Sequence, residues 1–179
     1  MHYDRPLART LLARTPATLR AQLIDLPAAW LDAPESPGAW SPSDVVGHMA
    51  DLEDTAWLPR IHWILEHGTE RALPSIAREA FRERYLGLPL TDVLDEFQAA
   101  RARNLAALDA LPLDDDTLRR AGAHPQLGEV RLSELLRTWV AHDLTHIAQV
   151  QRSLAAQLRD AVGPWQAFLS VMARRPGRE

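Results

Sequence analysis

The sequence predicts an all-α protein in which four long helices and one short C-terminal helix surround a single core. Ala and Leu, both strong helix formers, occur 28 times each among the 179 residues. Apolar residues recur at spacings near 3.6 in four long segments, whereas Gly and Pro fall mostly between those segments. No internal repeat or long linker interrupts the chain, so we expect one domain covering residues 1–179.

The first expected helix covers residues 7–26, where Leu recurs along one face. We expect a break or kink at Thr15-Pro16, because the residue before a proline avoids the helical region. Thr15 is then expected to cap a second piece of helix, with Pro16 at its first position, where the missing N–H costs nothing.

The second expected helix has the clearest start signal in the chain. Ser41 is the predicted N-cap, Pro42 takes the first helical position, and the helix dipole favours Asp44 in the first turn. An apolar stripe follows at helical spacing. We expect Pro59 to kink this helix and Gly68 to end it.

The remaining expected elements follow in chain order. They are an irregular or partly helical crossover at residues 69–89, a third helix capped by Thr91 and ending at Leu111, a short hairpin or turn at 122–130, a fourth long helix beginning at Ser133, and a short fifth helix at 163–172. The fourth helix has the broadest apolar face in the chain. Periodicity alone does not predict the order in which these helices pack.

Charge and composition exclude several classes of function. The net charge is −4, from 20 basic and 24 acidic residues, so there is no basic excess to bind nucleic acid. All basic residues are Arg and there is no Cys, which excludes a catalytic lysine, a cysteine nucleophile and a thiolate metal site. No stretch approaches the ~18 apolar residues that a membrane span needs, and the N-terminal stretch is no secretory signal. We therefore expect a cytoplasmic protein that contacts no membrane.

Three of the seven histidines share helix faces in a way that suggests a metal site. His142 and His146 stand four residues apart, about 6 Å along a helix, so both imidazoles can reach one ion. His48 lies on an apolar stripe, where an unpaired imidazole is costly. Its partner is either a backbone carbonyl or an Asp, or a metal ion held by the other two histidines. Three neutral imidazoles leave a position open for water or substrate, and zinc, nickel and iron(II) all accept such a set.

Other catalytic motifs that use these residue types do not match. The run HDLTH at residues 142–146 has Asp where the zinc-protease motif needs Glu as its general base. The chain has no Glu-x-x-His unit for a di-iron bundle and no G-x-S-x-G for a serine hydrolase. His62 and His67 follow Pro59, too far along the helix to join an ion at the first histidine.

The sequence resembles the DinB-like (DinB/YfiT) superfamily of small helical-bundle metalloproteins. The resemblance rests on WSPSDVVGH at residues 40–48, HPQLGEV at 124–130 and WVAHDLTH at 139–146, and it extends through most of the chain. It implies a four-helix bundle with a long crossover connection between its halves, and it implies that His48, His142 and His146 are metal ligands. It also implies that the nucleophile is metal-bound water or thiol, as in family members that are metal-dependent hydrolases or that transfer bacillithiol or mycothiol.

Five further side chains are candidates to support the site. Asp51, one turn beyond the first histidine, and Asp143 could accept the second ring N–H of a ligand, although either could be an ordinary surface carboxylate. Trp139 and Gln149 lie near the histidine face and could wall a pocket, with core packing the simpler role for Trp139. His124 either reaches the mouth of the metal site or is solvated.

These observations leave two functions of different class open. The first is a mononuclear metal-dependent hydrolase or low-molecular-weight-thiol transferase that acts on a small electrophile and uses zinc, nickel or iron. The second is a non-catalytic metal-binding, ligand-binding or interaction bundle, which the absence of an obvious general base favours. The expected partners are a small-molecule substrate and a second copy of the chain in a homodimer, with no nucleic acid.

Overall fold

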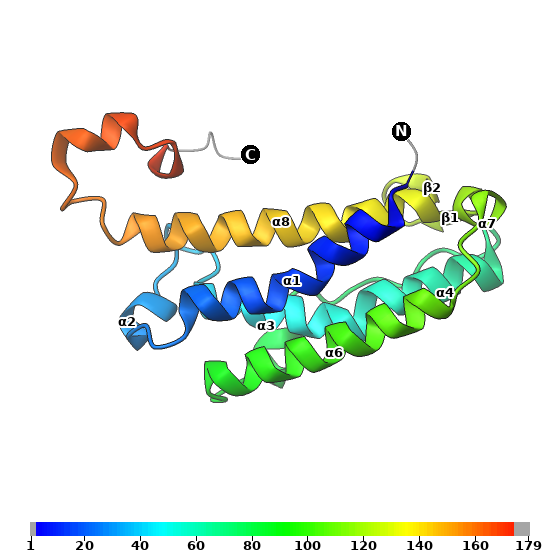
Figure 1. The fold of residues 1–179 in the computed structure, drawn as a ribbon, viewed down its shortest axis with the longest axis horizontal. Coiled ribbons are helices and arrows are strands. Elements are labelled where there is room, and N and C mark those ends of the chain that lie inside the picture. Colours follow the sequence, from blue (N-terminus) through cyan, green and yellow to red (C-terminus); the bar gives the residue numbers. More distant parts are fainter. Residues whose placement is uncertain (1–2, 174–179) are drawn as a thin grey trace.

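The computed structural model describes residues 3–173, which form a four-helix bundle, in agreement with the predicted fold class (Figure 1). The long elements are α1 (Arg5–Leu23), α3 (Pro42–Leu52), which continues through the π-helix η1 (Glu53–Trp57) into α4 (Leu58–His67), α6 (Leu90–Ala110) and α8 (Leu132–Ala156). The short elements are α2 (Ala28–Leu31), α5 (Ala80–Arg84), α7 (Asp115–Arg119), β1 (Ala121–His124), β2 (Gly128–Arg131) and the 3-10 turns η2 (Gly163–Phe168) and η3 (Ser170–Met172).

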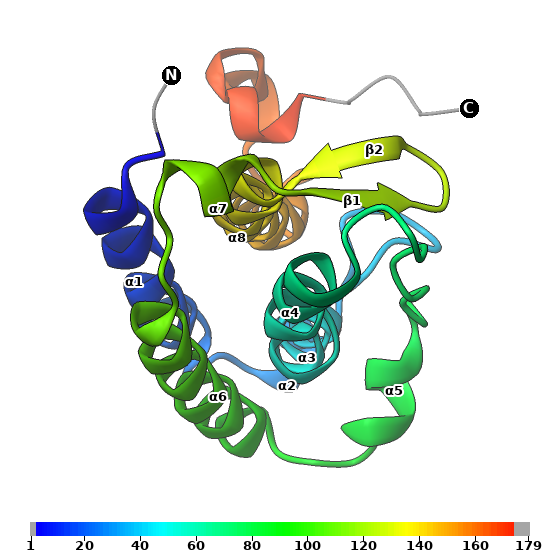
Figure 2. The ribbon, with the colours of Figure 1, turned by 90° about the vertical axis from the view of Figure 1, so that its right-hand side faces the viewer.

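The bundle needs a long crossover because two consecutive long helices are parallel. Helices α3 and α4 run in the same direction as α6, whereas α1 and α8 run the opposite way (Figure 1). After α4 the chain therefore returns along the bundle through residues 68–89, which contain α5. Seen end-on, α1 lies between α6 and α8, and α3 packs against the same two helices (Figure 2).

The crossover is held against α3 at a glycine. A Cβ on Gly47 would lie 3.0 Å from Cδ2 of Phe81 and 3.4 Å from Cδ2 of Tyr85. The missing side chain thus lets the rings of Phe81 in α5 and of Tyr85, its C-cap residue, approach the backbone of α3 one residue before His48. Both rings are buried in this contact.

Helix α1 does not break at Pro16, so of the two predicted forms of interruption, a break or a kink, the break is absent. The helix is continuous from Arg5 to Leu23 and bends along its length (Figure 1). Asp4 is its N-cap, and the hydroxyl of Thr15 donates to the carbonyl of Leu11 within the helix instead of capping a second piece. Burial of both Thr15 and Pro16 in the core compensates for the backbone hydrogen bond that a proline cannot make.

The second helix begins as predicted, but its interruption has a different form. Ser41 and Asp44 form a reciprocal capping box, and Gly68 ends α4 with a φ of 56°. The helix widens into η1 immediately before Pro59. In a regular α-helix the ring of Pro59 would clash with the carbonyl of Thr55, so the wider turn explains how the helix continues.

Three smaller predictions needed correction. Thr91 lies inside α6, whose N-cap is Pro89. The backbone of Pro89 is extended, as an N-cap requires, so the helix begins directly after it. Helix α8 begins at Leu132, one residue before the expected start, and follows a β1–β2 hairpin that the sequence predicted. The expected fifth helix at 163–172 consists of two 3-10 turns.

Two apolar clusters fill the bundle, and a layer of buried polar side chains separates them. On α6, Arg101 and Asn104 fall between Phe97 of one cluster and Leu105 of the other. We call this set the polar layer: His48, Glu53, Arg101, Asn104, Asp143 and His146, all at most 8% exposed. None of the helices in the described part of the chain combines the length and apolar character that a membrane crossing needs.

Candidate metal centre

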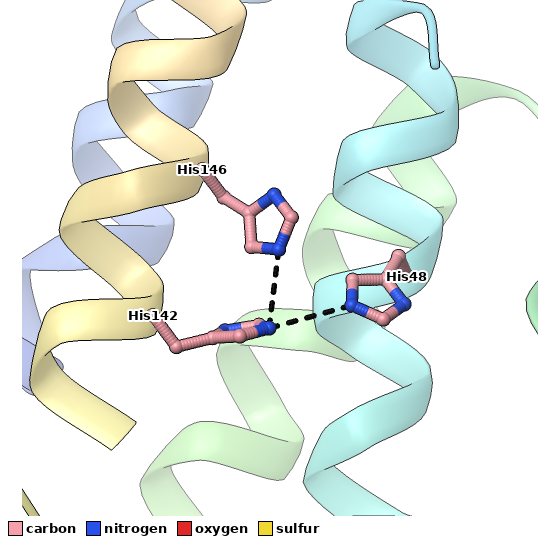
Figure 3. Close-up of side chains that lie close together, drawn as sticks. All are labelled: His48, His142 and His146. Atoms are coloured by element: carbon pink, nitrogen blue, oxygen red, sulfur yellow. Dashed lines mark hydrogen bonds between the residues drawn. The ribbon is translucent and has the colours of Figure 1, made fainter. Parts of the chain in front are cut away.

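Three histidine side chains from two helices converge, two of them from the polar layer and the third, His142, beside it. His48 comes from α3, whereas His142 and His146 come from successive turns of α8 (Figure 3). Nε2 of His142 lies 3.4 Å from Nε2 of His48 and 3.1 Å from Nε2 of His146. Within residues 3–173, no other group of three His, Asp or Glu side chains brings potential ligand atoms together in this way.

The i, i+4 spacing and the stagger of two antiparallel helices produce this convergence. Helices α3 and α8 run in opposite directions (Figure 1). His48, in the second half of α3, therefore meets the middle of α8 only through the packing of the bundle. The spacing of His142 and His146 then places both rings on the side of α8 that faces α3.

Burial keeps the three imidazoles neutral. It lowers the pKa of His48 to about 4 and that of His142 to about 2, and it also lowers the pKa of His146. The repulsion between the rings and the positive charge of Arg78 act in the same direction. Neutral imidazole is the form that binds a metal ion, so the rings are ready to act as ligands at neutral pH.

Hydrogen bonds at the outer ring nitrogens determine which nitrogen faces the centre. Nδ1 of His146 donates to Oε1 of Gln149 at 2.9 Å, so its Nε2 carries the lone pair. A hydrogen bond between His48 and the backbone of Arg78 raises the pKa of His48, against the larger effect of burial. Nδ1 of His142 is buried and has no hydrogen-bond partner.

This donor set fits a divalent metal ion. If Nε2 of His142 carries a proton, it can donate to Nε2 of His48 or to Nε2 of His146, but not fully to both. A cation at the centre can bind the lone pairs of all three nitrogens at once. Two nitrogens that are both about 2.0–2.1 Å from a tetrahedral zinc ion are about 3.3–3.4 Å apart. The two separations measured from Nε2 of His142 are close to this value. The site therefore could hold a metal ion in the absence of any cysteine.

The two carboxylates expected to support the histidines are engaged elsewhere. Asp51 accepts hydrogen bonds from Arg84 and Thr55, so it is no partner of His48. Asp143 binds Arg101 through both carboxylate oxygens, at 2.6 and 3.1 Å, and reaches His146 only through its charge. The outer nitrogens use an amide and a backbone group instead, because the buried Arg101 binds the nearer carboxylate more strongly.

The buried network around Arg101 was not predicted from the sequence. Its guanidinium also donates to Glu53 at 2.8 Å and to the carbonyl of Leu12 at 2.6 Å, and Asn104 donates to Glu53 at 3.0 Å. The network joins α1, η1, α6 and α8 directly behind the histidines. A sequence signal did exist, since Arg101 falls on the apolar stripe of its helix, but the stripe alone does not identify the carboxylates that neutralise it.

Aromatic rings enclose the histidines. Trp40 lies 4.5 Å from the ring of His48, and Trp57 lies 5.1 Å from the ring of His142. Trp139, expected near the site or in the core, is fully buried and stacks on Trp57 at 5.3 Å. It thus supports the site through Trp57 and does not line the cavity.

A cavity of about 400 Å³ opens onto His48 and His142. His124, at the end of β1, is among its lining residues. Its Nδ1 accepts hydrogen bonds from the backbone N–H groups of Gln126 and Leu127. His62 and His67 take no part in the cluster, in agreement with the prediction, and His2 lies outside the described residues.

A four-helix bundle with three converging histidines defines a class of helical proteins that can hold a metal ion between two helices. The sequence profile of the DinB superfamily matches residues 11–150, and the chain belongs to this superfamily. No curated protein matches the sequence.

Three solved structures share the fold. YfiT from Bacillus subtilis, described as a probable metal-dependent hydrolase with an unusual four-helix bundle topology, is 23% identical over 88% of this chain and 87% of its own, with a TM-score of 0.72. TT2238, a four-helix bundle protein, is 25% identical over 82% and 97%, with a TM-score of 0.53. A mutant of a mycothiol-dependent maleylpyruvate isomerase is 18% identical over 86% and 68%, with a TM-score of 0.59.

Proposed function

We propose that the protein is a mononuclear metalloenzyme that binds zinc, nickel or iron through His48, His142 and His146. Its reaction is hydrolysis or the transfer of a low-molecular-weight thiol to a small electrophile. The observation that carries the proposal is the convergence of three neutral Nε2 atoms beside a cavity of ligand size. A divalent ion bound there lowers the pKa of water or of a thiol and so supplies an anionic nucleophile near neutral pH.

The lining of the cavity favours thiol transfer over hydrolysis. None of its lining residues is Asp or Glu, and Nδ1 of His124 is occupied by two backbone N–H groups, so that ring offers an N–H donor and no free base. A thiol loses its proton at an ordinary pKa near 8.5, far below water, and needs less help from a protein base. The chain has no cysteine, so the thiol enters as a second substrate.

Elemental analysis of untagged protein tests the metal site directly. We expect about one ion per chain in the wild type and in His62→Ala, and loss of the ion in His48→Ala and His142→Ala. His62 is an exposed histidine on α4 and serves as the matched control. Absence of metal after reconstitution with zinc, nickel and iron(II) would contradict the proposal.

The absence of Asp and Glu from the cavity lining also favours the alternative function, a non-catalytic bundle that binds a metal or ligand. A panel of thiols with electrophiles, and of ester and amide substrates, separates the two functions. Turnover that disappears with the metal in His142→Ala supports the enzyme. A fully loaded protein without any turnover supports the binding protein.

We also propose that the chain forms a homodimer. Trp165 and Phe168 of η2 are 71% and 82% exposed, and large exposed aromatic side chains commonly mark contact surfaces. Light scattering after size-exclusion chromatography tests this proposal. The mass of a single 20.0 kDa chain would contradict it.

A further inference from the structure

The cavity beside the histidines is positively charged in a protein whose net charge is negative. The chain has 24 acidic and 20 basic residues, yet the charged side chains in the cavity lining are Arg60 and Arg78, with no Asp or Glu. The other walls are largely apolar, as at Leu52, Ile76 and Leu135. The cavity therefore offers an apolar surface and two cations.

Arg78 brings its charge close to the three histidines. Its guanidinium lies 4.6 Å above the ring of Trp40, which packs against His48 and, at 6.0 Å, against His146. No side-chain hydrogen bond or ion pair to Arg78 is found within residues 3–173. Glu79, the adjacent residue, has its carboxylate bound by Trp40 and Arg82. The Arg78 guanidinium is thus available to an anion in the cavity.

Arg60 contributes a second cation that the protein leaves uncompensated. Its Nη2 donates to the carbonyl of Pro74 at 3.2 Å, whereas its buried Nε has no hydrogen-bond partner. Partial burial lowers its pKa, and in the described part of the chain no carboxylate lies within ion-pair distance of it. His124, whose Nδ1 accepts a backbone N–H, lies in the same cavity lining. A partly buried charge of this kind is stabilised when an anion binds.

We propose that the substrate of this site is a small organic oxyanion. Its carboxylate or phosphate-type group is held by Arg60 and Arg78, and its apolar body lies along the aliphatic wall of the cavity. The inference rests on the proposed function, in that it assigns the substrate class of the same site. The positive cavity attracts such anions, and the guanidinium groups provide paired N–H donors for their oxygens.

Calorimetric titration of the full chain, with and without bound zinc, tests the inference. The probes are benzoate, its neutral counterpart benzamide, and phenylphosphonate. We expect benzoate or phenylphosphonate to bind at least about tenfold more tightly than benzamide, and the tighter of the two identifies the oxyanion. In Arg60→Gln and Arg78→Gln this preference should fall by roughly tenfold, whereas in Arg60→Lys and Arg78→Lys it should fall less, because they keep the positive charge but lose the paired N–H donors.

Arg103→Gln is the matched control, because Arg103 is 63% exposed on α6 and is not among the residues that line the cavity. Equal affinity for benzoate and benzamide, an unchanged preference in both Gln variants, or no binding at millimolar concentrations would overturn the inference. One zinc per chain with no anion preference overturns this inference alone. Arginine-dependent anion binding by a protein that takes up no metal supports the anion site and overturns the proposed metalloenzyme.

Discussion

At the scale of single residues, the outer contacts of the histidines determine what the site can bind. Gln149 accepts the Nδ1 proton of His146 and so directs the Nε2 lone pair toward the other two rings. Partners of this kind fix the tautomer and the orientation of a metal-binding imidazole. The amide of Gln149 performs the role that the sequence suggested for Asp51 or Asp143.

We therefore expect Gln149→Ala to bind zinc roughly 10- to 100-fold more weakly than the wild type without loss of helical content. Competition with a chromophoric chelator measures the affinity, and circular dichroism measures the helical content. Gln98→Ala, at an exposed position of α6, is the control. Equal zinc affinity in Gln149→Ala and the wild type would show that the orientation of His146 does not depend on this contact.

Burial of the histidines also predicts how stability depends on pH. Because the pKa of His48 is lowered to about 4 and that of His142 to about 2, the unfolded chain binds more protons than the folded chain below the ordinary histidine pKa of about 6.5. The free energy of unfolding of the metal-free protein should fall as the pH drops from about 6.5 to about 4, by up to roughly 1.4 kcal/mol per pH unit for each histidine.

Urea denaturation at about pH 7 and about pH 5 measures this dependence in the metal-free wild type and in His142→Gln. The loss on acidification should be smaller in the variant, since one depressed histidine is missing. Glu53, whose pKa burial raises, acts in the opposite direction and is present in both proteins, so its effect cancels in the difference. An identical loss in the two proteins would contradict the prediction.

At the scale of elements, the polar layer joins the four helices behind the metal site. Arg101 connects α6 to α1 through Leu12, to η1 through Glu53 and to α8 through Asp143. All three charged side chains are at most 3% exposed, so they depend on each other for compensation. The π-helix η1 contributes by burying Glu53 and Trp57 before α4 begins at Leu58.

Removing the cation should therefore destabilise the bundle strongly. We expect Arg101→Met to lower the free energy of unfolding by about 3–5 kcal/mol, because it leaves two carboxylates buried without the positive charge that compensates them. Arg103→Met, two residues farther along the same helix and exposed, should change it by less than about 0.5 kcal/mol. Urea denaturation provides both values.

A triple variant separates loss of compensation from loss of packing. Arg101→Met combined with Glu53→Met and Asp143→Leu should be more stable than Arg101→Met alone, because no buried charge remains. A triple variant less stable than the single variant would show that the network stabilises the bundle by more than mutual neutralisation.

At the scale of the whole molecule, a metal ion bound by α3 and α8 should stabilise the entire fold. Binding to the folded chain alone adds about 2.7 kcal/mol at a free metal concentration 100 times the Kd, which for a chain of this size corresponds to a rise in Tm of roughly 5 to 10 °C. Calorimetry with and without zinc should show this rise in the wild type and in His62→Ala. A rise of the same size in His48→Ala would place the zinc elsewhere.

The sequence determined much of the fold because the relevant signals are local. Helical spacing of apolar residues, the capping box at Ser41 and the glycine at Gly68 depend only on neighbouring residues, and they located the long helices to within a few residues. The three histidines were also identifiable, because an i, i+4 pair and a histidine on an apolar stripe are visible in one dimension, and the family motifs placed all three together.

Only the tertiary structure decided which groups compensate each other. Pro16 is tolerated inside α1 because its surroundings are buried, and Arg101 captures Asp143 because packing brings α6 against α8. The same packing leaves Gln149 as the partner of His146, and it brings Arg60 and Arg78 from separate segments into one cavity. Pairings of this kind join residues far apart in the chain, and their strength depends on burial and distance, which no local pattern of residues contains.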